Sequence, residues 1–257
     1  MKNLTRGHNA MRKLFVLLLA CVLVTVSAGG ASAVVYGEAG YLTEGYDEAS
    51  AWEINSVETL IKMRDDINSG KIKLLRYYKL TADLDISGYT DWEPIGKDSS
   101  YPFRGHFDGN EHTVTVKMTR ADVGYTGLFG YAEGGGIKNL SVTGNVKMSS
   151  QTTSGKYFAG GIAALIAGGT IDGCNFDGKL IMSTTNDKDV LYAGGIAGRV
   201  SDGTIITNCR VDGTINVSTL DEGISSLYAG GVTGYIYIAT VNSCRFDGEI
   251  SVLGANI

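Results

Sequence analysis

The chain has 257 residues, with 22 Lys and Arg, 27 Asp and Glu, 36 Gly and 2 Pro. Frequent glycine without proline, low-complexity runs or a triplet repeat excludes a collagen-like chain or a disordered linker, and indicates tight corners between short strands. The acidic excess argues against nucleic acid or an anionic membrane surface as a partner, because both need a cationic face.

Residues 1–33 have the pattern of a secretory signal peptide. An apolar run at 14–28 is followed by Ala31-Ser32-Ala33, a small-x-small cleavage site. The basic residues before it are Lys2, Arg6, Arg12 and Lys13. One alternative is a membrane anchor, but the uninterrupted apolar run is shorter than the ~20 residues of a spanning helix. The other is lipidation at Cys21, which lies inside the run. We expect cleavage after Ala33, a secreted or cell-surface location, and no membrane segment afterwards.

Cleavage would leave 18 basic against 27 acidic residues, and residues 34–124 would then form an N-terminal cap. A helix is predicted at 53–69, with Asn55 as N-cap and Glu58 three residues later. Residues 77–86 alternate as a strand. Residues 103–118 predict a β-hairpin around Gly109-Asn110, because both residues tolerate positive φ.

From residue 125 to 257 the sequence repeats itself about every 35 residues. Four segments align: YTGLFGYAEGGGIKNLSVTGNV, FAGGIAALIAGGTIDGCNFDGKL, YAGGIAGRVSDGTIITNCRVDGTI and YAGGVTGYIYIATVNSCRFDGEI. One glycine column is Gly127, Gly161, Gly195 and Gly231, and a second is Gly144, Gly178, Gly213 and Gly248. Two independent columns with one period indicate stacked structural repeats.

Each copy also carries an apolar triplet at fixed spacing. The triplets are Ile137/Leu140/Val142, Ile171/Cys174/Phe176, Ile206/Cys209/Val211 and Val241/Cys244/Phe246. The last two members of each are two residues apart, which places them on one face of a strand. We predict three short strands a copy: the Gly-Gly-Ile-Ala-Gly run, the end of the triplet, and a strand after an Asp-Gly corner.

Half-apolar short strands bury themselves only when copies stack at the ~4.8 Å strand spacing. We therefore predict an all-β chain, a parallel β-solenoid of about four repeats covered by the N-terminal helix. A three-sided right-handed coil is the simplest form.

The motifs WEPIG, YPFRGHFDGNEHTVTVKM and GLFGYAEGGGIKNL, followed by GGIAG-type repeats, resemble bacterial surface proteins with the GLUG motif. The motif core corresponds to Gly127-Leu128-Phe129-Gly130, and the resemblance covers about residues 52–252. It implies a secreted or wall-associated protein, often an adhesin-like or spacer region of a larger chain. Such repeats also occur as non-catalytic parts of IgA1-cleaving metallopeptidases, whose His-Glu-x-x-His signature is absent here. Ala164 and Thr233 depart from the repeat pattern, and the resemblance assigns no catalytic residue.

The cysteines Cys174, Cys209 and Cys244 recur every 35 residues. A disulfide suits an exported protein, and a metal site is a further alternative. Copy one has Leu140 at this position, however, so we predict buried free thiols acting as small apolar side chains.

No metal site or cofactor is predicted. Asp177, Asp212 and Asp247 form a column that could hold Ca²⁺, but Asp-Gly is also typical of a tight corner. We place His106 and His112 on opposite faces of the predicted hairpin, which argues against a shared metal ion.

Polar loops follow the third strand of their copies at 147–156, 182–190 and 218–226, and would align along one edge of the solenoid. Repeat proteins commonly bind through such an edge. The candidate binding residues are Asn186, Asp187, Lys188, Asp221, Glu222, Tyr235 and Tyr237.

Three functions remain open. The first is a non-enzymatic, adhesin-like module that binds host or extracellular glycans or matrix proteins. The second is a structural spacer with further domains in a longer chain. The third is a polysaccharide-degrading enzyme, for which the carboxylates in sequence proximity are Asp83, Asp85, Glu93 and Asp108.

Overall fold

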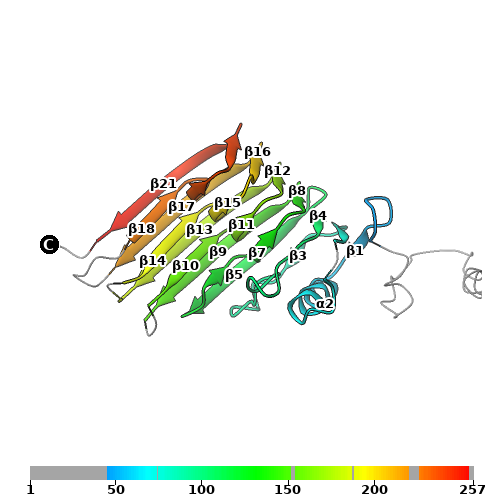
Figure 1. The fold of residues 1–257 in the computed structure, drawn as a ribbon, viewed down its shortest axis with the longest axis horizontal. Helices are drawn as coiled ribbons and strands as arrows, with labels where there is room; N and C mark the ends of the chain where they lie inside the picture. Colours follow the sequence, from blue (N-terminus) through cyan, green and yellow to red (C-terminus); the bar gives the residue numbers. More distant parts are fainter. Residues whose placement is uncertain (1–44, 74, 152–153, 187, 220–225, 255–257) are drawn as a thin grey trace, which may run out of the picture. The chain divides into compact units, whose positions relative to one another are not determined.

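The computed structural model describes residues 45–73, 75–151, 154–186, 188–219 and 226–254. Their strands stack in parallel as a β-solenoid (Figure 1), which confirms the predicted fold class. The signal-peptide prediction lies outside the described residues. No helical segment in the described part of the chain has the length and apolar character needed to cross a membrane.

The strands of the described residues form four sheets. Sheet A contains β1 (Trp52–Ile54), β2 (Tyr77–Leu80), β4 (His106–Asp108), β8 (Gly136–Lys138), β12 (Thr170–Asp172), β16 (Ile205–Thr207) and β20 (Thr240–Asn242). Sheet B contains β3 (Leu84–Asp85), β5 (Thr113–Ala121), β9 (Ser141–Ser150), β13 (Asn175–Thr184), β17 (Arg210–Thr219) and β21 (Arg245–Leu253). Sheet C contains β7 (Phe129–Glu133), β11 (Ala163–Ala167), β15 (Ala197–Ser201) and β19 (Thr233–Tyr237). Sheet D contains β6 (Tyr125–Thr126), β10 (Lys156–Gly160), β14 (Val190–Gly194) and β18 (Ser226–Gly230).

Each complete coil therefore passes through sheets D, C, A and B in that order, and the prediction of three strands a copy was wrong. The Asp-Gly pair is not a corner: Asp177 and Gly178 lie inside the ten-residue strand β13. The predicted Gly-Gly-Ile-Ala-Gly strand is instead broken at a corner, because Gly161 lies between β10 and β11. A side chain there would overlap the ring of Phe176, which fills the interior.

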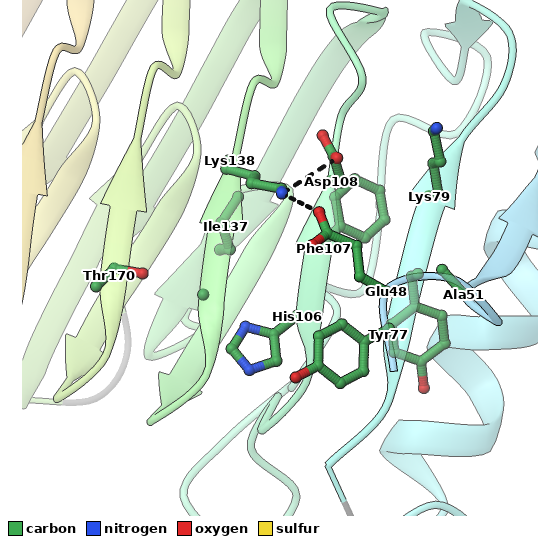
Figure 2. A pocket seen from close by; sticks show the side chains of 12 residues that line it. Glu48, Ala51, Tyr77, Lys79, His106, Phe107, Asp108, Ile137, Lys138 and Thr170 are labelled. Atoms are coloured by element: carbon green, nitrogen blue, oxygen red, sulfur yellow. Dashed lines mark hydrogen bonds and ion pairs between the residues drawn. The ribbon is translucent and has the colours of Figure 1, made fainter. Parts of the chain in front are cut away.

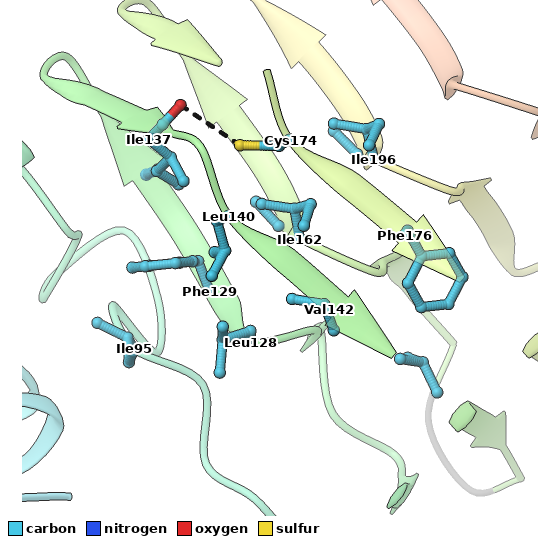
Figure 3. Close-up of a cluster of buried hydrophobic side chains, with 14 of the residues drawn as sticks. Ile95, Leu128, Phe129, Ile137, Leu140, Val142, Ile162, Cys174, Phe176 and Ile196 are labelled. Carbon is cyan, nitrogen blue, oxygen red and sulfur yellow. Dashed lines mark hydrogen bonds between the residues drawn. The ribbon is translucent and has the colours of Figure 1, made fainter. Parts of the chain in front are cut away.

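The predicted apolar triplets form the core. Ile171 pairs in register with Ile137 and Ile206, and Phe176 pairs with Val142 and Val211. These side chains are buried in one continuous cluster, drawn in part in Figure 3. Stacked coils thus turn each apolar position of the repeat into a column of the core.

The cysteine column lies in the same core. Leu140, Cys174 and Cys209 are buried, whereas Cys244, on the last described coil, is half-buried. The three cysteines of this column are free, as predicted, and burial raises the pKa of the Cys174 thiol. The Sγ of Cys174 lies 3.6 Å from the carbonyl oxygen of Ile137 (Figure 3).

The predicted helix is shorter than expected. α2 spans Val57–Asn68, because Trp52–Ile54 forms strand β1 beside β2. Its N-cap is Ser56 rather than Asn55: Ser56 Oγ accepts from the backbone N–H of Thr59, and Thr59 Oγ1 accepts from that of Ser56. The buried side chains of α2 include Leu60, Met63 and Ile67, which join the main core.

Residues 77–86 do not form one strand. They turn a corner between β2 in sheet A and β3 in sheet B. The coil needs this corner to carry the chain from one face of the solenoid to the next.

The predicted hairpin at 103–118 is also wrong. β4 pairs with β2 and β8, and β5 pairs with β3 and β9, all in parallel. Asn110 and Glu111 adopt positive φ, as a turn requires, but the turn joins two sheets rather than two paired strands. Phe103, Phe107, Val114 and Val116 are buried in the core.

Candidate ligand-binding site

The outward face of sheet A carries an interrupted column of side chains. Tyr77 pairs with His106, His106 with Gly136, and Gly136 with Thr170, on strands β2, β4, β8 and β12. Tyr77 and His106 stack, with ring centroids 4.5 Å apart and planes inclined by 23°. The next position lacks a side chain because it is Gly136.

The His106 ring and the Thr170 hydroxyl approach Gly136 from the two neighbouring strands. A Cβ at Gly136 would lie 2.8 Å from Thr170 Oγ1 and 3.2 Å from His106 Nδ1. Figure 2 shows His106 and Thr170 on either side of strand β8. These residues line a hollow of about 280 Å³, which we call the sheet A notch.

A charged group borders the notch along the next outward column. Lys138 forms ion pairs with Glu48 and Asp108, with Nζ 3.5 Å from Asp108 Oδ2 (Figure 2). The hydrogen bond to Glu48 raises the pKa of Lys138, so its ammonium stays charged at neutral pH. Two carboxylates therefore hold one ammonium in place beside the aromatic pair.

His106 has a lowered pKa, caused first by burial and then by the positive charge of Lys138. Its imidazole is therefore neutral at neutral pH. A neutral imidazole keeps one nitrogen as donor and the other as acceptor. The site thus offers an aromatic face together with an ammonium, carboxylate oxygens, an imidazole and a hydroxyl, which is a suitable set for a ligand rich in hydroxyl groups.

The predicted loop-edge residues are only partly described. Asp187, Asp221 and Glu222 lie outside the described residues. The side-chain amide of Asn186 donates to Ser150 Oγ on the neighbouring coil, at 3.3 Å, and Lys188 is exposed in a turn. Within this loop, the predicted binding role of Asn186 and Lys188 stays a prediction.

The buried residue of that loop has a structural contact. Asp189 is 1% exposed, and its Oδ1 accepts a hydrogen bond from the backbone N–H of Gly155 at 2.9 Å. The carboxylate therefore ties two successive loops together.

The other two predicted residues lie on β19, in sheet C. Tyr235 contacts the rings of Tyr192 and Tyr228 edge-on, with centroids 5.6 and 5.4 Å away, and Tyr237 is exposed. Tyr235 thus belongs to an aromatic cluster formed by sheets C and D.

The family model described as "The GLUG motif" matches residues 189–216. This segment covers β14, β15, β16 and the first part of β17, which is one pass through sheets D, C, A and B. The chain therefore contains a GLUG motif. The matched copy is the third of the four aligned segments.

A crystal structure from Bacteroides ovatus, named as a candidate immunoglobulin A1 protease, is similar at 16% sequence identity over 82% of this chain and 84% of that one, with a TM-score of 0.46. No curated protein matches the sequence.

The carboxylates considered for catalysis are separated in the GLUG-motif solenoid. Asp83 lies at a corner and accepts from His112, Asp85 lies on β3 of sheet B, and Asp108 lies on β4 of sheet A. The remaining one, Glu93, accepts from the side-chain amide of Asn68. These four residues do not come together as a group.

The aspartate column is part of sheet B. Arg210 pairs with Asp212, and Arg245 pairs with Asp247, within the strands β17 and β21. The expected corner role was therefore wrong. In the described ranges, no three His, Cys, Asp or Glu side chains gather as a metal site would require.

Sequence reasoning missed the sheet A notch. Tyr77, His106 and Gly136 come from three different coils, and Glu48 comes from a segment before β1. One signal was available in the sequence. Thr170, Ile205 and Thr240 are equivalent residues of copies two, three and four, and copy one has Gly136 at the same position.

Proposed function

We propose that this GLUG-motif solenoid is a non-enzymatic, adhesin-like binding module of a secreted or cell-surface protein, and that the sheet A notch holds one sugar residue of an extracellular glycan. The observation that carries the proposal is the outward column in which the stacked pair Tyr77 and His106 is followed by Gly136. The hollow beside this pair is where the sugar would lie against the aromatic rings.

The side chains beside Gly136 define where a sugar would lie. His106 Nδ1 and Thr170 Oγ1 lie 3.2 and 2.8 Å from the position of a Cβ on Gly136, so a sugar ring does not fit between them. The sugar would lie on the outer side of the two residues, where the aromatic surface attracts the polarised C–H groups of a sugar. The Thr170 hydroxyl would lie at its edge.

Polar groups at the rim match sugar hydroxyls. Lys138 donates hydrogen bonds, Asp108 accepts them, and the Thr170 hydroxyl does both. Asp108 is also largely buried, with 18% of its side chain exposed, so its position is well defined. Such a set holds a hydroxyl-rich ring in a fixed orientation.

The charge balance favours a neutral sugar. Lys79 and Lys138 bring two positive charges, and Glu48 and Asp108 bring two negative charges, while His106 is neutral at neutral pH. An anionic sugar would gain no net attraction here. We also propose that the protein is exported, because residues 1–33 have the pattern of a signal peptide.

The test is a glycan and matrix-protein array probed with wild-type protein and the double variant Tyr77→Ala/His106→Ala. Tyr89→Ala, which removes an exposed tyrosine (47%) outside the notch, is the matched control. The proposal expects binding to a neutral glycan by the wild type and Tyr89→Ala and loss in the double variant, with all three proteins folded.

Two results would contradict the proposal. Retained binding in the double variant, lost when residues 182–190 are replaced by Gly and Ser, would place the site on the loop edge. No binding by folded wild type across the array would favour a structural spacer.

A further inference from the structure

A second aromatic surface lies outside the main core, between sheets D and C. Four rings from successive coils of sheet D stack along it. Tyr125 and Phe158 are 5.4 Å apart, Phe158 and Tyr192 4.9 Å, and Tyr192 and Tyr228 5.0 Å, with interplanar angles of 15°, 7° and 7°. Tyr125, Phe158 and Tyr192 join Leu165 in a hydrophobic cluster separate from the main core.

The facing column on sheet C contains one charge. Tyr131, Leu165, Arg199 and Tyr235 occupy equivalent positions of β7, β11, β15 and β19. The Arg199 guanidinium lies 5.7 Å from the centre of the Tyr235 ring, and Tyr235 contacts both Tyr192 and Tyr228. A cation is thus placed among aromatic rings.

Arg199 lacks an acceptor. Its Nε is buried without a hydrogen-bond partner, and within the described ranges its guanidinium forms neither a hydrogen bond nor an ion pair. The arginines paired with carboxylates are Arg64, Arg104, Arg120, Arg210 and Arg245. Among the described residues, Arg199 is therefore a cation in an aromatic surface without a paired carboxylate.

An unmatched guanidinium favours a ligand that supplies the acceptor. A buried donor without a partner is costly, and a planar carboxylate meets two guanidinium N–H groups at once. Burial also raises the pKa of the Tyr192 phenol, so its hydroxyl stays protonated and can donate. The rings of Tyr228 and Tyr237, 38% and 49% exposed, offer apolar surface on the next coil.

We propose that Arg199, with Tyr192, Tyr228 and Tyr235, forms a second binding site that takes a carboxylate-bearing sugar such as a hexuronic acid. The carboxylate would bind the guanidinium, and the sugar ring would lie against the tyrosines. The site uses sheets C and D, so it does not depend on the sheet A notch and differs from it in the charge of its ligand.

The experiment is calorimetric titration of the full protein with trigalacturonic acid, its methyl ester, neutral galactotriose and inorganic sulfate. The variants are Arg199→Gln and Arg199→Lys, with Arg210→Gln as the control because Arg210 is an exposed arginine on sheet B. The proposal expects wild type and Arg210→Gln to bind the acid alike. Arg199→Gln should bind at least about tenfold more weakly, and Arg199→Lys should also bind more weakly, because lysine lacks the bidentate geometry.

If an Arg199 variant does not fold, the methyl ester still tests the site in the wild-type protein, because esterification removes only the negative charge of the ligand. Equal binding of acid and ester by the wild type would overturn the proposal. So would binding of sulfate as tight as that of the acid, which would indicate a general anion site. Tyr77→Ala/His106→Ala should bind the acid normally, which separates this result from that of the sheet A notch.

Discussion

Gly178 lies directly over Gly144 in the neighbouring coil of sheet B, so close that a Cβ on Gly178 would overlap the carbonyl oxygen of Gly144. Gly213 has the same relation to Gly178, and Gly248 to Gly213. The second glycine column of the repeat therefore exists because neighbouring backbones approach closely inside a continuous strand. No side chain fits between them.

Gly178→Ala should therefore destabilise the solenoid by about 3 kcal/mol or more, since the clash is with backbone and the strand must shift. Urea unfolding measures the change in the free energy of unfolding. Gly88→Ala is the control, because a Cβ at Gly88 has no neighbour within 4 Å. A loss below about 1 kcal/mol for Gly178→Ala would contradict the close approach.

The outer aromatic stack should contribute to stability as the core does. Phe158 is 5% exposed and lies between Tyr125 and Tyr192, so Phe158→Ala should cost about 3 kcal/mol in the free energy of unfolding. Tyr89→Ala should change it by less than about 0.5 kcal/mol. Comparable small effects for both variants would show that the stack is not packed as described.

The thiols should differ in their reaction with a thiol-specific reagent. Cys174 is fully buried and burial raises its pKa, so it should stay unmodified in the native protein. Cys244, which is only half-buried, should react faster. Mass spectrometry of the labelled peptides distinguishes the sites. Detection of a disulfide between Cys174 and Cys209 would contradict the free-thiol column.

The repeat period was enough to predict the solenoid and its core. Apolar positions such as Ile171, Cys174 and Phe176 can be buried only if they stack on their equivalents in other copies. The number of sides could not be predicted in the same way. Gly161 lies at a corner, where a Cβ would overlap the ring of Phe176, and Gly178 lies inside a strand, where a Cβ would overlap the backbone of Gly144. Both columns are glycine in all four copies, so the sequence pattern does not distinguish a corner from a strand.

The hairpin was mispredicted because the local signal is ambiguous. Asn110 and Glu111 do adopt the positive φ of a turn, but a turn between two sheets needs the same backbone as a turn between two paired strands. The partners of β4 and β5 lie on other coils. The sheet A notch was missed for a similar reason. Its residues lie on different coils, and the number of residues at each corner decides which of them align.

Acid should weaken the fold through His106. Its pKa in the folded protein lies below the ordinary value because burial and Lys138 disfavour the imidazolium. Its contribution is therefore fully present above about pH 6.5, the ordinary histidine value, and is lost as the pH falls from there towards the folded pKa.

The melting temperature of wild type and His106→Gln measured across this pH range tests that sign. The difference between them should change in favour of His106→Gln as the pH falls, because glutamine does not titrate. A difference that moves the other way would show that folding raises the pKa of His106.

The central claim, that a sugar binds in the sheet A notch, is tested most directly by NMR of the histidine side chains during titration with a glycan that binds on the array. His106 lines the notch, whereas His112 lies at a corner against Asp83 and serves as an internal reference. The account predicts that the His106 imidazole signals shift to saturation while those of His112 stay in place. Saturable binding with unmoved His106 signals would contradict it.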